Sequence, residues 1–339
     1  MKKTSDKEIR SAADEIRHSQ SGKEFIFITD KKVYKLYGKS LMTENRTIVV
    51  PTGEKSKSLR TVENIYTKLI KFRADKNTVV VGVGGGVVCD IAGFAASTYK
   101  RGTGLILVPT TLLAQIDASL GGKNGVNFKN HKNAIGTFKE PDRVIIDSDL
   151  LKTLDRRNFN NGVAELIKTA LITDGDLFKR ISRLPVNKMK GQELAEIIGT
   201  AGKLKSDIVS TDPYDTGSRK ILNFGHTFGH AVEMSLSGLL HGEAVSIGML
   251  FACLISEKIT GLDIKETEKI KKTLITNGLP VKLSGEISVQ SLMDSVYQDK
   301  KKNMDKIDMI LLERIGSPVI KTLNINQLKG YLNDFCKRI

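Results

Sequence analysis

The sequence predicts an α/β domain with a mostly parallel, Rossmann-like sheet, followed by a mainly α-helical domain. Short apolar runs alternate with helical stretches up to about residue 148, a run of glycines follows the third of them, and the pattern beyond residue 150 is helical. A length of 339 residues also fits about two domains. We therefore expect the α/β domain to span residues 1–148 and the helical domain residues 149–339.

The strands expected in the first domain are apolar on both faces. The segment between the second and third strands, residues 58–73, has the period of a helix. Runs that are apolar throughout are typical of a parallel sheet with helices on both faces, which is a nucleotide-binding architecture. The five runs are residues 25–28, 47–50, 78–81, 105–108 and 144–146.

A glycine turn joins the third strand to the next helix. The segment VVVGVGGGVVCD, residues 79–90, predicts a strand, a turn and the start of a helix. Glycines let backbone amides approach a pyrophosphate closely, and the helix N-terminus attracts its charge. Asp90 is then placed to accept a hydrogen bond from a ribose or substrate hydroxyl. The segment is not the six-position Rossmann fingerprint, so a tight turn without a ligand and an acid that only interacts with the helix dipole stay open as alternatives.

Polar residues follow the fourth strand. Thr110 and Thr111 come directly after it, Lys123 follows two glycines, and Lys132 and Asn133 add a second cation and an amide. Ligands of open α/β sheets bind at the carboxyl ends of the strands. We therefore expect a binding site here, although each of these residues would also suit an ordinary loop.

The second domain is expected to contain several helices and one late strand. Its apolar residues recur with a helical period, and no internal repeat or low-complexity linker interrupts the chain. The clearest helical stretches are residues 163–171, 194–209, 227–234 and 243–259, and the strand is 309–312.

Three of the five histidines lie within sixteen positions, which indicates a metal site. His226 and His230 are four residues apart on one helix face, and His241 follows a glycine-containing loop. A catalytic zinc ion takes three ligands from His, Glu or Asp and keeps a fourth position open. Glu165, a lone acid in an apolar helix with Lys168 one turn on, is the candidate carboxylate. The alternatives are a Glu165–Lys168 pair on a helix surface and hydrogen-bonded imidazoles in a core.

The formal charge of +15, from 53 lysines and arginines against 38 acids, fits a polyanionic small substrate, a nucleic acid or a basic surface. Many lysines alternate with acids, which favours a solvated surface with a local anion site. Three scattered cysteines exclude a disulfide framework, no apolar run suits a membrane span, and the polar amino terminus does not resemble a secretory signal. We expect a cytoplasmic protein that binds neither nucleic acid nor a membrane.

Six linked blocks resemble the 3-dehydroquinate synthase family. They occur in the order of the family, and the resemblance runs from about residue 53 to residue 310. Cys89 stands where the family usually has glycine, and the first 45 residues do not follow its usual opening. The blocks are GGGVVCD (84–90), YKRG (99–102), VPTTLLAQIDASLGGK (108–123), NGVAELIK (161–168), LNFGHTFGHA (222–231) and LHGEAV (240–245).

The resemblance implies an NAD-binding first domain and a metal- and substrate-binding second domain. In the family one glutamate and two histidines hold zinc, and they fall here on Glu165, His226 and His241; cobalt or another divalent metal is an alternative. The implied NAD-binding residues are Thr52, Gly53, Glu54, Lys55, Ser56, Lys57, Gly86, Val87, Val88, Cys89, Asp90, Thr110, Thr111, Lys123, Lys132, Leu150 and Thr153. The implied substrate-contacting and catalytic residues are Arg101, Asp117, Lys123, Asn133, Lys168, Lys205, Arg219, Asn223, His230 and one of Lys300 and Lys301, here taken as Lys301.

The resemblance also implies the reaction, a step of the shikimate pathway that leads to chorismate and the aromatic amino acids. The substrate, 3-deoxy-D-arabino-heptulosonate 7-phosphate, is oxidised transiently at C5 by NAD, loses phosphate by β-elimination, regains the hydride and closes to 3-dehydroquinate by an intramolecular aldol step. The family suggests a homodimer, with Arg101 reaching the phosphate from the partner chain as one arrangement. Other sugar-phosphate cyclases, glycerol-type dehydrogenases that release NADH, and a nucleic-acid-binding protein with salt-dependent retention are the alternatives.

Overall fold

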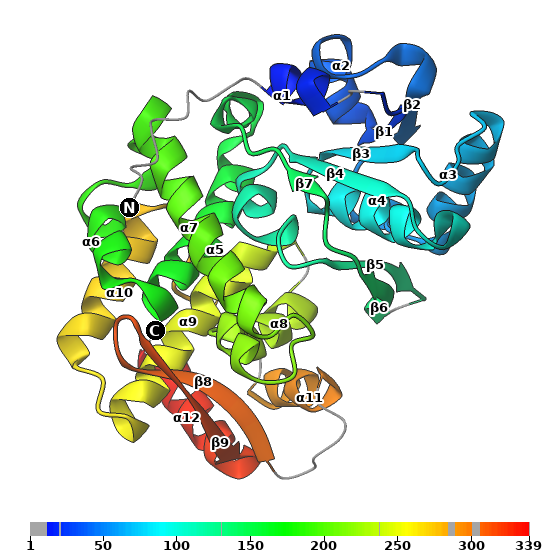
Figure 1. The fold of residues 1–339 in the computed structure, drawn as a ribbon. Coiled ribbons are helices and arrows are strands. Elements are labelled where there is room, and N and C mark those ends of the chain that lie inside the picture. Colours follow the sequence, from blue (N-terminus) through cyan, green and yellow to red (C-terminus); the bar gives the residue numbers. More distant parts are fainter. Residues whose placement is uncertain are drawn as a thin grey trace. The chain divides into compact units, whose positions relative to one another are not determined.

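The structure, a computed structural model, describes residues 12–19, 22–129, 131–236, 238–283, 289–299 and 306–338. The chain forms two compact units, Met1–Leu154 and Asp155–Ile339 (Figure 1). The domain boundary expected between residues 148 and 149 stays a prediction. Among the described residues, no helix is both long and apolar enough to span a membrane.

The first unit is built on a five-stranded sheet in the order β2-β1-β3-β4-β7, in which every neighbouring pair is parallel. The strand β1 lies between β2 and β3, so its residue Ile28 lies opposite Ile48 on one side and Gly82 on the other. This sheet confirms the predicted parallel fold class. Its strands are β1 Phe25–Asp30, β2 Thr47–Val50, β3 Val79–Gly84, β4 Gly104–Pro109 and β7 Arg143–Val144.

Helices cover both faces of this sheet, as its apolar strands predict. Successive side chains of a strand point to opposite faces. Ile26 and Ile28 therefore join one core with the helices α3 (Leu59–Lys71) and α4 (Gly86–Thr98). Phe25 and Phe27 join a second core with α1 (Ala12–Ser19) and α2 (Lys31–Leu41).

A hairpin that the sequence did not predict follows β4. Its strands β5 (Lys123–Phe128) and β6 (His131–Phe138) pair antiparallel, so Lys132 and Asn133 are strand residues and not loop residues. Most of β6 is exposed, and it begins with three polar residues, so its intrinsic strand preference is weak and its pairing with β5 outweighs that preference. The short helical turns of this unit are η1 Glu44–Arg46, η2 Glu54–Ser56, η3 Tyr99–Arg101, η4 Ala114–Ala118 and η5 Ser148–Thr153.

The second unit is mainly helical, as predicted. The helices α5 and α9 pack against each other, and α8 packs on α9. Phe228, Phe251 and Phe335 form an aromatic cluster with ring centroids 4.4 to 5.8 Å apart. The helices are α5 Arg156–Thr173, α6 Gly175–Arg183, α7 Gly191–Thr211, α8 His226–Ser235, α9 His241–Ile259, α10 Ile264–Thr276, α11 Val289–Asp299 and α12 Ile325–Arg338, with the turns η6 Val186–Lys188 and η7 Ser218–Asn223.

A second hairpin adds one strand to the single strand that we expected in this unit. The strand β8 (Lys306–Arg314) contains the predicted run 309–312 and pairs antiparallel with β9 (Ser317–Asn324). Pro318 lies in β9, and a proline lowers the strand signal of a sequence. The pairing with β8 forms the strand in spite of it.

Candidate active site

Three side chains from three helices converge in the second unit. Glu165 lies in α5, and His226 and His241 are the first residues of α8 and α9. Their ligand atoms all lie within 4.8 Å of one another. Oε1 of Glu165 is 3.5 Å from Nε2 of His226 and 3.3 Å from Nε2 of His241. The structure thus brings together the three residues that were expected to share a metal ion.

Helix packing places His226 at this point. Gly225, which precedes it, has a left-handed backbone with φ of 76°. The helix α9 passes close by, because a Cβ atom on Gly248 would lie only 2.0 Å from the carbonyl oxygen of Gly225. The absence of a side chain at 248 therefore lets α9 approach the first turn of α8.

The Nδ1 atom of each histidine faces an oxygen. Nδ1 of His226 lies 3.2 Å from the carbonyl oxygen of Phe224, and Nδ1 of His241 lies 3.5 Å from Oε2 of Glu233. An oxygen acceptor at Nδ1 favours a hydrogen there and directs the Nε2 lone pair to the other side, toward a metal ion. Sequence reasoning overlooked Glu233, although its spacing of seven residues from His226 puts both on one face of α8.

Lys168 forms an ion pair with Oε2 of Glu165. The pair was one alternative to a metal site, but its expected position on a helix surface is wrong: the side chains are only 3% and 1% exposed. Burial by itself raises the pKa of Glu165, but the charge of Lys168 and the contacts with His226 and His241 hold that pKa well below its usual range. Glu165 is therefore an anion at neutral pH.

The two histidines differ in charge. Burial and the nearby Lys168 ammonium lower the pKa of His226 to about 3, so this ring is neutral. Burial also acts to lower the pKa of His241, but its contacts with Glu165 and Glu233 outweigh it and raise that pKa to about 9. Metal ligation requires neutral imidazole, so an ion bound here would displace a proton from His241.

The donor set suits a divalent metal. Both carboxylate oxygens of Glu165 are buried, and neither accepts a hydrogen bond of good geometry from the described residues. One carboxylate and two imidazoles are the ligands of many catalytic zinc sites, which leave one position open. His230 lies beside the cluster, with its ring centroid 5.4 Å from that of His226 and 6.0 Å from that of His241, but it is outside the group of converging ligand atoms.

The other expected substrate residues of this unit lie on α7 and η7, which both contact α5. Lys205 and Arg219 are buried, and Asn223 is exposed at the end of η7. The Asp212 carboxylate accepts the backbone N–H groups of Thr216, Gly217 and Arg219 at 2.7 to 3.0 Å. The Arg219 guanidinium donates to the carbonyl oxygen of Pro213 at 2.8 Å. Lys301 lies outside the described residues.

In the first unit, the glycine turn lies at the carboxyl end of the sheet. β3 ends at Gly84 and α4 begins at Gly86, where the first N–H groups of the helix have no intrahelical acceptors. A Cβ atom on Gly84 would lie 2.6 Å from Cβ of Val88, so helix packing alone requires this glycine. The N–H of Thr110 donates to the carbonyl oxygen of Gly84 at 2.9 Å, which joins the ends of β3 and β4. The N–H groups at the start of α4 make this turn suitable for a nucleotide pyrophosphate.

Lys57, itself an expected NAD-binding residue, contacts two other expected residues, Asp90 and Asn133. Its buried ammonium forms an ion pair with Asp90 and donates to Oδ1 of Asn133 at 2.5 Å. Burial raises the pKa of Asp90 to about 6, against the opposing charge of Lys57. The structure thus brings together two expected NAD-binding residues and one expected substrate residue, from the segment after β2, from α4 and from β6.

The remaining expected residues of the first unit lie in several places. Thr52 donates a hydrogen bond at 2.9 Å to Asp30, which ends β1 and caps α2. Tyr37 donates to the carbonyl oxygen of Leu150 at 3.0 Å and lies 2.7 Å from Oγ1 of Thr153. Gly53 directly precedes η2, which holds residues 54–56. Arg101 ends η3, Asp117 lies in η4, and Lys123 and Lys132 are exposed on the hairpin.

Two solved enzyme structures share this fold over nearly the whole chain. ValA, a 2-epi-5-epi-valiolone synthase from Streptomyces hygroscopicus subsp. jinggangensis with NAD+ and Zn2+ bound, is 28% identical, with a TM-score of 0.88 over 100% of this chain and 99% of that chain. A 2-deoxy-scyllo-inosose synthase complexed with carbaglucose-6-phosphate, NAD+ and Co2+ is 26% identical, with a TM-score of 0.81 over 94% of each chain. Together with the Glu–His–His cluster, this likeness puts the chain in the sugar-phosphate cyclase class.

The sequence comparisons define the family within that class. Residues 47–161 match the family described as 3-dehydroquinate synthase N-terminal, and residues 162–302 match 3-dehydroquinate synthase C-terminal. A 3-dehydroquinate synthase from Enterococcus faecalis is 41% identical over 315 residues, which cover 90% of this chain and 88% of the relative. The chain belongs to the 3-dehydroquinate synthase family.

Proposed function

We propose that the chain converts 3-deoxy-D-arabino-heptulosonate 7-phosphate to 3-dehydroquinate and phosphate, as an NAD- and metal-dependent lyase of the shikimate pathway. The observation that carries this proposal is the convergence of Glu165, His226 and His241 in a chain of this family. The proposed metal is zinc, with cobalt as a substitute. Relatives of the same fold bind these ions together with NAD+.

A bound NAD would supply a reversible hydride acceptor for C5, and a bound metal ion would supply a Lewis acid for the C5 oxygen. Glu165, His226 and His241 supply the ligands for the ion. Lys168 keeps Glu165 anionic, and the Phe224 carbonyl orients the ring of His226. The protein thereby holds its ligand atoms in place before the substrate arrives.

The substrate carries a carboxylate and a phosphate, so the site needs cations. We assign Lys205 and Arg219 to substrate binding because buried cations attract an anion more strongly than exposed ones. A guanidinium also matches the geometry of a carboxylate or phosphate. Asp212 fixes the backbone of Arg219, and Asn223 and His230 complete the proposed contacts of this unit.

NAD is assigned to the carboxyl end of the parallel sheet. The amides of Gly86 and Val87 would bind the pyrophosphate at the N-terminus of α4. Asp90 and Thr110 would accept and donate hydrogen bonds to the rest of the dinucleotide. The other NAD and substrate residues expected in this unit keep the roles that the family resemblance implies.

We propose that the protein is located in the cytoplasm. We also propose that it forms a homodimer, in which the exposed Arg101 reaches the substrate phosphate of the partner chain. Sedimentation equilibrium at assay concentrations is expected to give twice the mass of the chain. A monomer that turns over at the full rate would contradict the dimer and the role of Arg101 across it.

The function is tested by incubating the enzyme with the heptulosonate phosphate and trace NAD while phosphate and NADH are followed together. We expect phosphate in amounts equal to the substrate consumed, many turnovers for each NAD and no accumulation of NADH. Accumulation of NADH in step with substrate loss would indicate a dehydrogenase of the glycerol type. The absence of phosphate release would contradict the proposal outright.

A further inference from the structure

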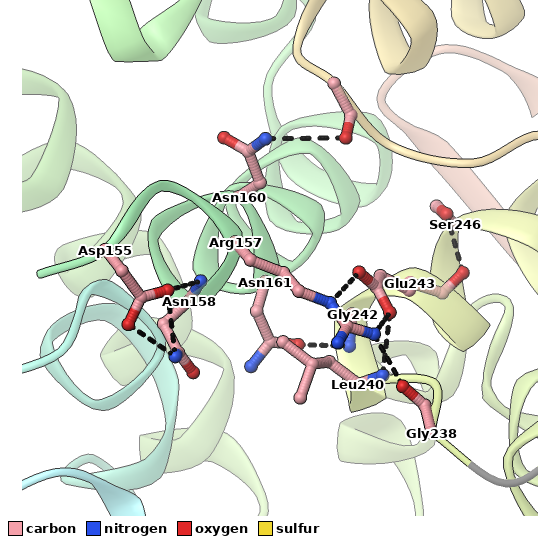
Figure 2. A network of polar contacts seen from close by, with 11 residues as sticks. Asp155, Arg157, Asn158, Asn160, Asn161, Gly238, Leu240, Gly242, Glu243 and Ser246 are labelled. Carbon is pink, nitrogen blue, oxygen red and sulfur yellow. Dashed lines mark hydrogen bonds and ion pairs between the residues drawn. The ribbon is translucent and has the colours of Figure 1, made fainter.

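One face of α5 carries both a proposed metal ligand and two contacts to the start of α9. Arg157, Asn161 and Glu165 follow one another at intervals of four residues, so they lie on the same side of the helix. Glu165 belongs to the metal cluster, whereas Arg157 and Asn161 hold the residues around His241 (Figure 2).

Arg157 forms a two-pronged ion pair with Glu243. Its Nε lies 2.7 Å from Oε1 and its Nη2 lies 2.7 Å from Oε2 of that carboxylate. Nη2 also donates to the carbonyl oxygen of Gly238 at 2.5 Å, and Oε2 of Glu243 accepts the N–H of Leu240 at 2.8 Å. These bonds fix the chain directly before His241 and the first turn of α9.

Asn161 fixes the residue directly after His241. Its Oδ1 accepts the N–H of Gly242 at 2.5 Å. A Cβ atom on Gly242 would lie 2.2 Å from the carbonyl oxygen of Asn161, so the backbones of α5 and α9 touch at this point. Any larger residue at position 242 would push the start of α9 away from α5.

We infer that Arg157 and Asn161 are positioning residues for the metal ligand His241. They attach the backbone on both sides of His241 to the helix that carries Glu165, and so set the separation of 3.3 Å between His241 Nε2 and Glu165 Oε1. The inference rests on the proposed function, because it takes these two atoms to be metal ligands.

The Arg157–Glu243 ion pair is expected to orient the start of α9 more than it stabilises the fold. The Arg157 side chain is 56% exposed, and ion pairs open to solvent contribute little to folding. A bidentate pair nevertheless fixes the relative orientation of its two partners. Loss of these contacts is therefore expected to affect metal binding more than the melting temperature.

The test compares zinc affinity in Arg157→Met and Asn161→Leu with that of the wild type, by competition with a chromophoric chelator. Loss of outer contacts to metal ligands weakens binding by about 10- to 100-fold, so we expect the dissociation constant of zinc to rise at least 10-fold. The visible spectrum of the Co2+-loaded variants is expected to change, because the ligand geometry changes. Asn161→Asp keeps an oxygen acceptor and is expected to restore both readouts.

Two control variants lie in the same unit. Arg180→Met removes another interhelical Arg–Glu pair, with Glu196 at 3.4 Å, and Asn158→Ala alters an asparagine of α5 whose side chain bonds to Asp155. Both are expected to bind zinc as the wild type does. If Arg157→Met does not fold, Arg157→Lys, which loses the two-pronged geometry but keeps the charge, replaces it.

Zinc affinities within twofold of the wild type for both Arg157→Met and Asn161→Leu would overturn the inference and leave the proposed function intact. Equal losses in the control variants would overturn it as well, because the effect would then be general destabilisation. A wild type that binds no zinc would contradict the metal centre itself, and the inference with it.

Discussion

At the scale of single residues, the ionisation of Glu165 depends on Lys168. The carboxylate is buried, and removing a charge from water is costly unless an opposite charge lies close. In the metal-free protein Lys168, one helical turn away, and the protonated His241 supply that charge. A divalent metal ion bound to Glu165 would bring more positive charge than the proton that it displaces from His241. Lys168 therefore matters most to the fold when no metal is bound.

The variant Lys168→Met tests this dependence. Breaking a buried pair from one side costs about 3–5 kcal/mol, so we expect a loss of this size in the free energy of unfolding of the EDTA-treated protein. The loss is expected to be smaller in the zinc-loaded protein. Urea unfolding of both forms measures the difference.

Lys179→Met is the matched control, because Lys179 pairs with Asp176 at the same helical spacing but in solvent. Its expected loss is below about 1 kcal/mol in either form. Equal losses for Lys168→Met with and without zinc would show that Lys168 does not stabilise the charge of the metal site.

At the scale of secondary-structure elements, the packing of α4 on β3 leaves no room for a side chain at position 84 of the glycine turn. Gly84→Ala would place a Cβ atom 2.6 Å from Cβ of Val88. Overpacking of this kind costs about 1–3 kcal/mol. Gly199 lies exposed within α7, where a Cβ atom would meet nothing within 4 Å. Gly199→Ala is expected to stabilise the protein by about 0.5–1 kcal/mol, since alanine favours helices.

Thermal or urea unfolding of these two alanine variants is expected to give changes of opposite sign. A Gly84→Ala variant as stable as the wild type would mean that the strand and the helix are separated more widely than the structure shows.

The turn before η7 depends on an ionised carboxyl group. Hydrogen bonds from the backbone N–H groups of Thr216, Gly217 and Arg219, the first of these contributing most, lower the pKa of Asp212 to about 2. A pKa below that of the unfolded chain means that Asp212 stabilises the fold above about pH 4, and that this contribution is lost as the pH falls toward 2.

Asp212→Asn is therefore expected to be less stable than the wild type at pH 6, with a difference that shrinks by pH 3. Urea unfolding at several pH values gives this difference directly. A difference in the free energy of unfolding that stays constant between pH 6 and pH 3 would contradict a stabilising role for ionised Asp212.

The strands β6 and β9, which sequence reasoning missed, form by pairing with the strand directly before them and not from an apolar run of their own. The strand β6 begins with polar residues and forms by pairing with β5. The strand β9 contains Pro318, which weakens its strand signal in the sequence, and forms by pairing with β8. The helix expected at 163–171 begins at Arg156, because Asp155 caps its polar first turns. Arg157 and Asn161 lie in that added part, so their contacts with α9 could not be expected from the periodicity.

Some residues of the candidate site can be found from the sequence pattern, and others only from the structure. His226, His230 and His241 stand out by their spacing, and Glu165 stands out as an acid among apolar residues. Glu233 resembles any other helical acid until α9 places His241 beside it. The assignment of individual substrate and NAD residues came from the family resemblance and remains a prediction.

At the scale of the whole molecule, the two units carry different parts of the proposed reaction. The first unit has the parallel sheet and the helix N-terminus that suit a dinucleotide, and the second has the Glu–His–His cluster. The formal charge of +15 fits a substrate that carries both a carboxylate and a phosphate. Turnover is therefore expected to require NAD and a divalent metal at the same time.

The central claim is that one divalent ion, held by Glu165, His226 and His241, supports a reaction that recycles its NAD. Titration of zinc into EDTA-treated enzyme, with phosphate release as the readout and trace NAD present, tests it most directly. We expect no release without metal, a linear recovery up to one zinc ion per chain, and no recovery in Glu165→Ala or His241→Ala despite retained helical content. Full phosphate release by the metal-free wild type, or full zinc content and rate in either variant, would contradict the claim.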